Sequence, residues 1–318
     1  MWIFLLLGCD FEAAPAPGDT AEAVFDVARG STARGIAADL AQAGLVTSAD
    51  RWGWFLRLGG DGSCLKAGKH RVHKAMTAPE LLAALCGVPV ADDVPFTVVE
   101  GWRRRDIDQA LAAQGLIAAG AYLAATEKGA AYSPGFPVPA GNLEGYLFPD
   151  TYQVAPDHFD PQRFVERQLQ AFGERFALAE GAANGGRTME QVVIVASMIE
   201  REEPSKANRP LVAGIMWKRL DASWNLGIDA TSRYTLADWN DEPAFLHQLF
   251  DPADTYNTRL RSGLPPTPIG NPGIESLNAA MHPESTDFWY YLHDASGTIH
   301  PSRSVREHDA LKRKWLGR

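Results

Sequence analysis

The pattern of apolar and polar positions repeats itself within the first half of the chain. Residues 25–46, FDVARGSTARGIAADLAQAGLV, align without gaps with residues 96–117, FTVVEGWRRRDIDQALAAQGLI, which begin 71 positions later. In each copy, a short apolar stretch is followed by a glycine, then by apolar residues about four positions apart, then by a second glycine. Each copy therefore predicts a short strand, a glycine turn and an amphipathic helix that ends at the second glycine.

A related segment lies between the two copies. Residues 67–85, AGKHRVHKAMTAPELLAAL, predict a strand followed by a helix. Thr77 and Glu80 have the spacing of a capping box, in which two side chains bind the free backbone N–H groups at a helix start. We therefore expect residues 21–138 to form an N-terminal region of small strand and helix units, without an obvious catalytic cluster.

The composition changes near Pro139, where Pro, Gly and aromatic residues crowd into the segment at positions 143–152. A chain of 318 residues is long enough for about two domains of ordinary size. We therefore place a domain boundary between Ala118 and Ala140, and we expect the domain at residues 139–318 to carry the chemistry.

One helix of this second domain is predicted to lie in the core. Thr188 and Gln191 have the spacing of a capping box, and residues 192–199 are apolar except for Ser197. A helix that is apolar on nearly every face is buried. Pro204 is expected to end or kink this helix.

The charge of the chain argues against a nucleic-acid partner. It contains 30 Lys and Arg against 39 Asp and Glu, a net charge of -9. An acidic chain repels nucleic acid unless it carries a strong local basic patch. The two short basic runs, Arg103–Arg105 and Lys312–Lys314, have the pattern of solvated helix faces.

The first residues have the features of a targeting segment. The apolar run from Met1 to Leu7 is too short to span a bilayer, for which about 20 residues are needed. Leu6-Leu7-Gly8-Cys9 is similar to a bacterial lipobox, in which cleavage leaves a lipidated cysteine, here Cys9, as the N-terminus. Residues 1–20 would then be a signal and a tether, the tether running from Asp10 to Thr20. A plain secretory signal or a misassigned start are the alternatives.

Cysteine and histidine spacing does not indicate a metal site. Cys64 and Cys86 are not part of a CxxC motif, and they form either one disulfide in an oxidising compartment or two separate thiols. The chain contains no HExxH or comparable histidine pair. We therefore expect neither a metal nor another cofactor; the histidines near the C-terminal end are His282, His293, His300 and His308.

Glu200 is the acidic residue best placed for chemistry. It follows the apolar helix directly, so its carboxyl is expected to lie half in the core and half in a cleft. Desolvation disfavours the charged form of a carboxyl, and a carboxyl in such a place keeps a proton that it can donate to a glycosidic oxygen. The local sequence also fits a purely structural ion pair of Glu200 with Arg201 or Arg209.

Five blocks resemble, in the same order, those of the MltG-type (YceG-like) endolytic murein lytic transglycosylases. They are LEGYLFPDTY (143–152), VIVASMIEREE (193–203), LGIDATSRYTL (226–236), YNTRLRSGLPPTPIGNPGIESLNAAMHP (256–283) and GTIHPSRSVREH (297–308). In that family the glutamate of the second block is the catalytic acid/base, which corresponds to Glu200. The resemblance implies cleavage of the bond between MurNAc and GlcNAc within peptidoglycan strands. The MurNAc 6-hydroxyl closes on C1 to leave a 1,6-anhydroMurNAc end, so no second carboxylate is needed.

Other positions that match the family motifs are candidates for binding the glycan. They are Glu144, Asp229, Tyr256, Asn257 and Thr258. Sugars offer hydroxyl groups to polar side chains and CH faces to aromatic rings, so this mixture suits a glycan groove. Each has a structural alternative: Tyr256 as a core residue, Asp229 as a helix cap and Glu144 as a surface charge.

The resemblance covers nearly everything after the tether and implies an α+β protein, with a LysM-like N-terminal module before an α+β catalytic domain. It implies work on nascent strands beside peptidoglycan synthases, on the periplasmic side of the inner membrane. A lipid on Cys9 would replace the transmembrane anchor that is usual in the family. Three positions depart from the family pattern, which has Gln at Gly227, Pro at Ala230 and Phe at Ser302, and the last block is one residue shorter before His308.

Two other functions remain open on the sequence. One is a peptidoglycan-binding scaffold whose second domain has lost activity. The other is a hydrolytic muramidase with Glu203 or Asp229 as second carboxylate. Glu203 lies three residues after Glu200 and shares its helix face if the helix persists. The end group of the product distinguishes the enzymes, because hydrolysis leaves a reducing sugar.

Overall fold

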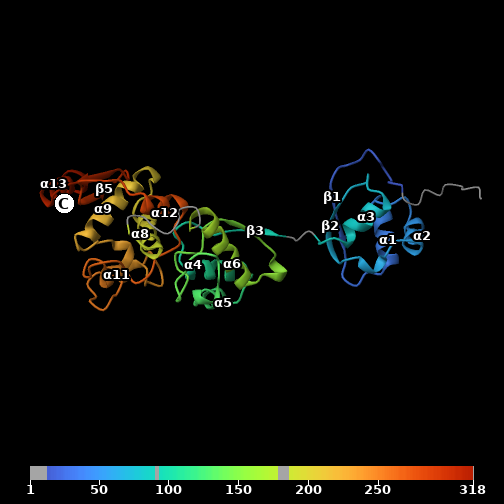
Figure 1. Ribbon diagram of the computed structural model, residues 1–318, viewed down its shortest axis with the longest axis horizontal. Helices are drawn as coiled ribbons and strands as arrows, with labels where there is room; N and C mark the ends of the chain where they lie inside the picture. The colour runs from blue at the N-terminus through green and yellow to red at the C-terminus, as the bar shows by residue number, and fades with distance from the viewer. Residues whose placement is uncertain (1–12, 90–92, 178–185, 318) are drawn as a thin grey trace, which may run out of the picture. The chain divides into compact units, whose positions relative to one another are not determined.

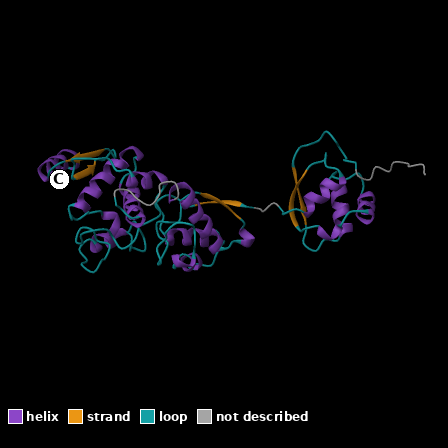
Figure 2. Ribbon diagram, viewed as in Figure 1, coloured by secondary structure: helices purple, strands orange, loops and turns teal. Residues whose placement is uncertain are grey.

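The structure, a computed structural model, describes residues 13–89, 93–177 and 186–317 and is an α+β protein with two compact units (Figure 1). The first unit ends at Asp93 and the second begins at Val94. Helices dominate both units, and the strands form two-stranded antiparallel sheets (Figure 2). Cys9 and its predicted lipobox lie outside the described residues. Among the residues described, no helix combines the length and the apolar character needed to cross a membrane.

The first unit packs helices around its own small core. Its elements are β1 (Ala23–Val27), α1 (Ala33–Gln42), α2 (Ala49–Leu58), η1 (Gly62–Cys64), β2 (Gly68–Val72) and α3 (Ala78–Cys86). Strands β1 and β2 pair with Phe25 opposite His70. The predicted capping box starts α3, where the Thr77 N–H donates to Glu80 Oε2 at 2.8 Å. The core includes Phe25, Ile36, Leu40, Trp52, Leu81 and Leu85.

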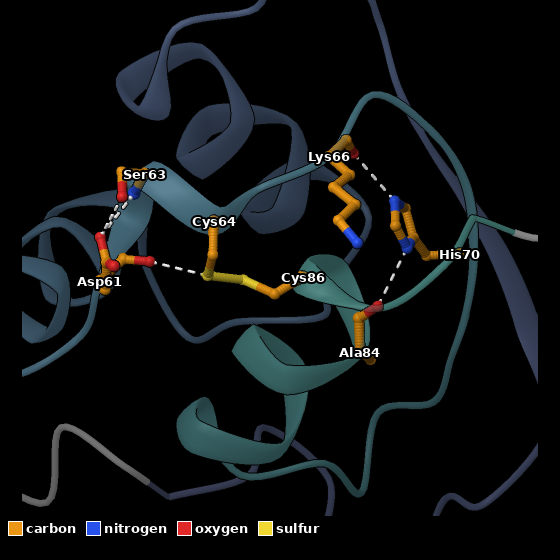
Figure 3. Close-up of a disulfide and its surroundings, with 7 residues drawn as sticks. All are labelled: Asp61, Ser63, Cys64, Lys66, His70, Ala84 and Cys86. Atoms are coloured by element: carbon orange, nitrogen blue, oxygen red, sulfur yellow. Dashed lines mark hydrogen bonds between the residues drawn. A yellow bond between two sulfur atoms is a disulfide. The ribbon is translucent and has the colours of Figure 1, made fainter.

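A disulfide between Cys64 and Cys86 ties η1 to the end of α3 (Figure 3). The two Cα atoms are 5.1 Å apart. Beside the disulfide, the buried ring of His70 has its two nitrogens 2.9 Å from the carbonyl oxygens of Lys66 and Ala84. Of the two alternatives for these cysteines, the structure contains the disulfide, which is typical of an oxidising compartment.

Part of the predicted tether is folded onto the first unit. The Ala16 N–H donates to the Lys74 carbonyl at 3.0 Å, and the Ala75 N–H donates to the Asp19 carbonyl at 2.9 Å. Lys74 and Asp19 also form an ion pair at 3.8 Å. The tether prediction is therefore wrong for residues 16–19, because backbone hydrogen bonds that composition does not reveal hold them in place.

The second unit begins with β3 (Val94–Thr97), α4 (Arg104–Ala113), α5 (Ala121–Ala125), η2 (Gly129–Ala131), β4 (Thr151–Val154), η3 (Pro156–His158), α6 (Pro161–Phe172) and η4 (Gly173–Ala177). It continues with α8 (Met189–Glu202), η5 (Lys206–Asn208), α9 (Arg209–Asp221), α10 (Asp229–Arg233), α11 (Glu242–Gln248) and α12 (Ile274–Met281). The last elements are β5 (Tyr290–His293), β6 (Ile299–Ser302) and α13 (Val305–Leu316).

The boundary between the units lies before the second copy of the repeat, and not between Ala118 and Ala140 as predicted. Strand β3 pairs with β4, with Phe96 opposite Tyr152, and α4 packs against α5, which packs against α6. The apolar residues of all these elements join one core. Both copies do form the predicted strand, turn and helix, but the first copy belongs to the first unit and the second copy to the second unit.

Helix α8 is the centre of the second unit. The predicted capping box is present, since the Thr188 N–H donates to Gln191 Oε1 at 2.9 Å and the Gln191 N–H donates to Thr188 Oγ1 at 3.2 Å. Every residue from 192 to 199 is buried, as predicted, and α8 packs against α9, α10 and α12. Ser197 accepts the Ile269 N–H at 3.0 Å and so attaches the proline-rich loop before α12. The helix ends at Glu202, before Pro204.

Candidate active site

An open groove with a volume of about 1030 Å³ lies in the second unit beside the C-terminal end of α8. One face of α4 with the turn before it, the last turn of α8 and the loop after α10 form its walls. The aromatic and charged side chains of its lining include Trp102, Arg103, Asp106, Glu200, Arg201 and Trp239. Two tryptophans among charged groups form a lining that suits a saccharide.

Glu200 lies in the last turn of α8 and lines this groove. Its side chain is only 6% exposed. Arg209 donates to both carboxylate oxygens, at 2.8 and 3.2 Å, and the Gly273 N–H donates to Oε2 at 3.0 Å. The structural ion pair with Arg209 is therefore present. It fixes both oxygens in one orientation, which serves a reacting carboxylate as well as a structural one.

Gly101 brings the loop before α4 against the end of α8. Its φ of +82° lies in the left-handed region. A Cβ at this position would stand 3.3 Å from Arg201 Cδ and 3.5 Å from Glu200 Cγ. The glycine of the second repeat copy thus permits both the turn and the close approach to Glu200.

Asn271, in the proline-rich loop, holds the loops behind the groove, and the sequence analysis did not single it out. Its Oδ1 accepts the N–H groups of Gly145 and Leu147 at 2.9 and 3.0 Å, and its Nδ2 donates to the Trp102 carbonyl at 2.9 Å. Its own carbonyl accepts the Gly101 N–H at 2.7 Å. This fully buried side chain therefore joins three loops that are far apart in the sequence.

Glu144 lies behind the groove wall and not on its surface. It is 2% exposed, so neither a direct contact with glycan nor the surface-charge alternative fits its place. Its two oxygens accept the Arg104 N–H at the start of α4 at 3.1 and 3.2 Å, and Oε2 also accepts the Tyr234 hydroxyl at 3.0 Å. Burial raises the pKa of Glu144 to about 7, although the charge of Arg104 acts in the opposite direction. These hydrogen bonds connect Glu144 to the start of α4.

The basic run at Arg103–Arg105 was predicted to be a solvated helix face. This prediction is wrong for Arg103 and Arg104, because both are buried. Arg103 donates to both carboxylate oxygens of Asp106, at 2.8 and 3.0 Å, and to the carbonyl of Leu236 at 2.8 Å. Arg104 donates to Thr126 at 2.8 Å. The guanidinium groups find acceptors on distant loops, which a local charge pattern does not reveal.

Asp229 lies apart from the groove lining. It is the first residue of α10, but the N-cap is Ile228 and no side chain caps this helix, so the alternative of a helix cap is wrong. It is half-exposed and pairs with Arg259 at 2.5 Å. Burial raises the pKa of nearby Glu202, and the charge of Asp229 adds to this effect.

The residues at positions 256–258 hold the loop after α11 in place. Asn257 is fully buried, donates to the Leu249 carbonyl at 2.9 Å and accepts the Arg259 N–H at 3.0 Å. Thr258 is buried and accepts the Ile228 N–H at 2.9 Å. The interior place of these two side chains differs from the predicted role in glycan binding. Tyr256 is half-buried and packs on Tyr234, with the ring centres 4.8 Å apart.

The second carboxylate of a muramidase is not provided by Glu203. This residue follows the end of α8, is fully buried and lies 3.0 Å from His293 Nε2, so it does not share the helix face of Glu200. Glu100 is a different candidate that the sequence analysis missed. It is exposed, and its Oε1 lies 2.2 Å from the point where a Cβ on Gly273 would stand, so it approaches the same glycine as Glu200.

The histidines near the C-terminal end do not converge. His293 contacts Glu203 at 3.0 Å, and His300 contacts Asp294 at 2.8 Å and stacks on Trp315. His308 stacks on Tyr290. Among the described residues, no group of three or more His, Cys, Asp or Glu side chains is arranged to hold a metal ion.

Comparisons with known proteins identify the family and the fold. The model of the YceG-like family matches residues 25–314. The chain is 29% identical over 175 residues to the endolytic murein transglycosylase of Bacillus subtilis (strain 168), which covers 55% of this chain and 48% of that protein. It is 23% identical over 172 residues to the endolytic murein transglycosylase of Streptococcus pneumoniae (strain R6), covering 52% of this chain and 31% of that protein. The matches thus span about half or less of these curated relatives. The fold is shared with a YceG-like protein from Listeria monocytogenes, whose crystal structure superposes with a TM-score of 0.61 at 24% sequence identity. The match covers 92% of this chain and 99% of the Listeria chain.

Proposed function

The chain belongs to the YceG-like family, and we propose that it is an endolytic peptidoglycan lytic transglycosylase with Glu200 as its acid/base. It cleaves the β-1,4 bond between MurNAc and GlcNAc within a glycan strand and so terminates nascent strands. The observation that carries the proposal is a carboxylate with a fixed orientation, Glu200, in a groove that also contains two tryptophans. The names of the relatives from Bacillus subtilis and Streptococcus pneumoniae support the same reaction.

In the proposed reaction, Glu200 gives its proton to the oxygen of the glycosidic bond, and GlcNAc leaves with that oxygen as a hydroxyl group. The MurNAc O6 then attacks C1 of its own sugar, and its proton passes to the Glu200 carboxylate. A C1–O6 bond replaces the broken bond, Glu200 ends protonated as it began, and no water is consumed. One carboxylate is enough because the substrate supplies the nucleophile.

The surrounding residues position this carboxylate and the sugar. Arg209 and the Gly273 N–H orient the two oxygens of Glu200. Trp102 and Trp239 offer ring faces on which the CH faces of sugars pack. Glu144 does not contact the sugar in this proposal. It binds the start of α4 and so positions the groove wall that carries Asp106.

A hydrolytic muramidase is the second candidate, and the position of Glu100 favours it. Hydrolysis needs a carboxylate that activates water or attacks the sugar. Glu100 is exposed and approaches Gly273, whose N–H binds Glu200. In this variant of the proposal, Glu100 takes the role that the sequence suggested for Glu203 or Asp229, and the product ends in a reducing sugar.

The proposed site of action is the bacterial cell envelope, on the periplasmic side of the inner membrane. The disulfide of the first unit supports an oxidising compartment. The order of strand, two helices and strand in that unit supports its resemblance to a LysM-like module that binds glycan. Lipid attachment at Cys9 and association with peptidoglycan synthases are further parts of the proposal.

The test is the chemistry of the ends released from purified peptidoglycan, identified by mass spectrometry. We expect 1,6-anhydroMurNAc ends from the wild type and none from Glu200→Gln. Glu190→Gln is the matched control, because it makes the same substitution at an exposed position of the same helix and is expected to keep wild-type activity. Reducing ends would establish the muramidase instead. Binding to peptidoglycan without any release of ends would favour the scaffold.

A further inference from the structure

Arg201 is a cation in the groove that has no hydrogen-bond acceptor within the described part of the chain. It follows Glu200 directly and lines the groove. Among the residues that the structure describes, no carboxylate or carbonyl oxygen accepts a hydrogen bond from its guanidinium group. Its close partner is instead the ring of Trp239, with Cζ 3.5 Å from the ring centre. A guanidinium group carries five N–H donors, so this arrangement leaves its donors to the solvent of the groove.

The neighbouring charges explain why Arg201 forms no ion pair with another described residue. The carboxylates that act on it electrostatically are Asp106 and Glu200, and the nearby cation is Arg103. Arg103 occupies both oxygens of Asp106, and Arg209 occupies both oxygens of Glu200. Each anion therefore already has its own arginine. Arg201 is the third arginine at two carboxylates, and burial lowers its pKa while leaving it a cation.

The contacts of Arg201 also fix the direction of its donors. A guanidinium group that stacks on an aromatic ring keeps its N–H groups in a plane parallel to the ring, where they can bind a carboxylate through two parallel hydrogen bonds. On another side, the side chain passes close to Gly101, where a Cβ would stand 3.4 Å from Nη1. Trp239 and Gly101 thus hold the group without using its donors.

We propose that Arg201 binds a carboxylate of the glycan strand next to the bond that is cut, with Trp239 as the support of the guanidinium group. This inference rests on the proposed function and adds to it a determinant of substrate choice. Two sources offer this chemistry in peptidoglycan. A strand without peptides carries a free lactyl carboxylate on each MurNAc, and a strand with peptides carries the carboxylates of its stem peptides. A glycan without either group lacks the partner that Arg201 requires.

The test compares the full-length wild type with Arg201→Gln and Arg201→Lys on four strand preparations. These are strands with stem peptides, strands from which the peptides have been removed, and both preparations after their carboxylates have been converted to amides. Arg187→Gln is the matched control. Arg187 also stacks on a tryptophan, Trp217 at 4.3 Å, but it lines a different groove and is paired with Asp221 at 2.6 Å.

On strands with free carboxylates, we expect Arg201→Gln to lower kcat/KM by roughly 10- to 100-fold, mainly through KM, as for the loss of a hydrogen bond to a charged group. Arg201→Lys should retain part of the activity, and Arg187→Gln should retain all of it. On amidated strands the wild type should fall to the level of Arg201→Gln, and the substitution should have no further effect. If Arg201→Gln loses activity on strands without peptides, the carboxylate is that of the lactyl group. If it loses activity only on strands with peptides, the carboxylate belongs to the stem peptide.

An equal loss in Arg201→Gln on charged and amidated strands would overturn the inference, and so would an unchanged kcat/KM on both charged preparations. Strand affinity is measured in parallel by calorimetry. If the wild type binds strands but releases no ends, the proposed reaction fails. The affinities of wild type, Arg201→Gln and Arg187→Gln for charged and amidated strands still decide the role of Arg201.

Discussion

The two copies of the repeat share a local backbone and differ in what packs against it. Gly30 and Gly101 stand at the same position of the two copies, and both have a φ of +82°. A Cβ on Gly30 would meet no atom within 4 Å, whereas a Cβ on Gly101 would stand 3.5 Å from Glu200 Cγ. The same turn is therefore open to solvent in the first unit and packed against Glu200 and Arg201 in the second.

The starts of the two following helices differ in the same way. In the first copy, Thr32 Oγ1 accepts the Gly35 N–H at 3.1 Å, a cap supplied by a residue of the turn itself. In the second copy, Asp106 caps the helix locally by accepting the Arg103 N–H at 2.8 Å, and Glu144, 40 residues further on, binds the Arg104 N–H in addition. A local cap makes a helix that is complete within its own segment. The additional, distant cap couples the helix to the loops behind the groove.

The largest effect is expected at Asn271, which fixes the second copy to the rest of its unit. Asn271→Ala leaves the buried N–H groups of Gly145 and Leu147 without acceptors. Each unsatisfied group costs about 1–3 kcal/mol, so we expect a loss of about 4 kcal/mol in the free energy of unfolding. Thr32→Ala in the first copy should cost only about 1 kcal/mol. Urea denaturation measures both, and equal losses would contradict the difference between the copies.

An intermediate effect is expected from the titration of Glu144. Burial raises its pKa from 4.5 to about 7 in the folded protein. Between these values the unfolded chain has lost this proton and the folded protein still holds it, so stability falls as the pH rises through this window. The gap corresponds to about 3 kcal/mol, which is present below pH ~4.5 and lost above pH ~7.

The check on Glu144 is urea denaturation at several pH values for the wild type and Glu144→Gln. The variant cannot titrate at this position, so its stability should decline less between pH ~4.5 and ~7 than that of the wild type. Thr32→Ala removes a neutral cap and should shift stability by the same amount at every pH. Parallel pH profiles for the wild type and Glu144→Gln would refute the role of burial.

The smallest effect on stability is expected from substitution of the equivalent glycines Gly30 and Gly101. These two variants also compare the two copies most directly. Gly30→Ala and Gly101→Ala force the same left-handed backbone on a side chain, at about 1–2 kcal/mol each. Only the methyl group at position 101 presses on Glu200 and Arg201. We therefore expect similar losses of stability but a decrease in kcat/KM of about tenfold or more for Gly101→Ala alone, because small displacements of reacting groups are costly. Equal activities of the two variants would show that this contact does not matter.

The features that could be predicted from the sequence are those that depend on neighbours along the chain. The two repeat copies, the capping boxes at Thr77 and Thr188 and the buried helix before Glu200 follow from local spacing, and the structure confirms them. The domain boundary could not be predicted from local spacing, because it depends on the pairing of Val94 with Val154, two residues far apart in the sequence.

The same limit applies to the candidate site. Glu200 could be found because it directly follows the apolar run of a helix and matches a family block, but Arg201 and Trp239 meet only in the folded chain. Asn257 matched a family motif, yet a motif does not tell whether a polar side chain faces the solvent or, as here, is fully buried. Residues whose role depends on a distant partner therefore needed the structure.

The most direct test of the central claim is to digest peptidoglycan with the wild-type chain in oxygen-18 water and to weigh the released MurNAc ends. A lytic reaction at Glu200 predicts ends that lack one water relative to a reducing sugar and contain no heavy oxygen. Ends that carry one heavy oxygen at C1 would contradict the account and make the protein a hydrolase, with Glu100 as the first carboxylate to examine.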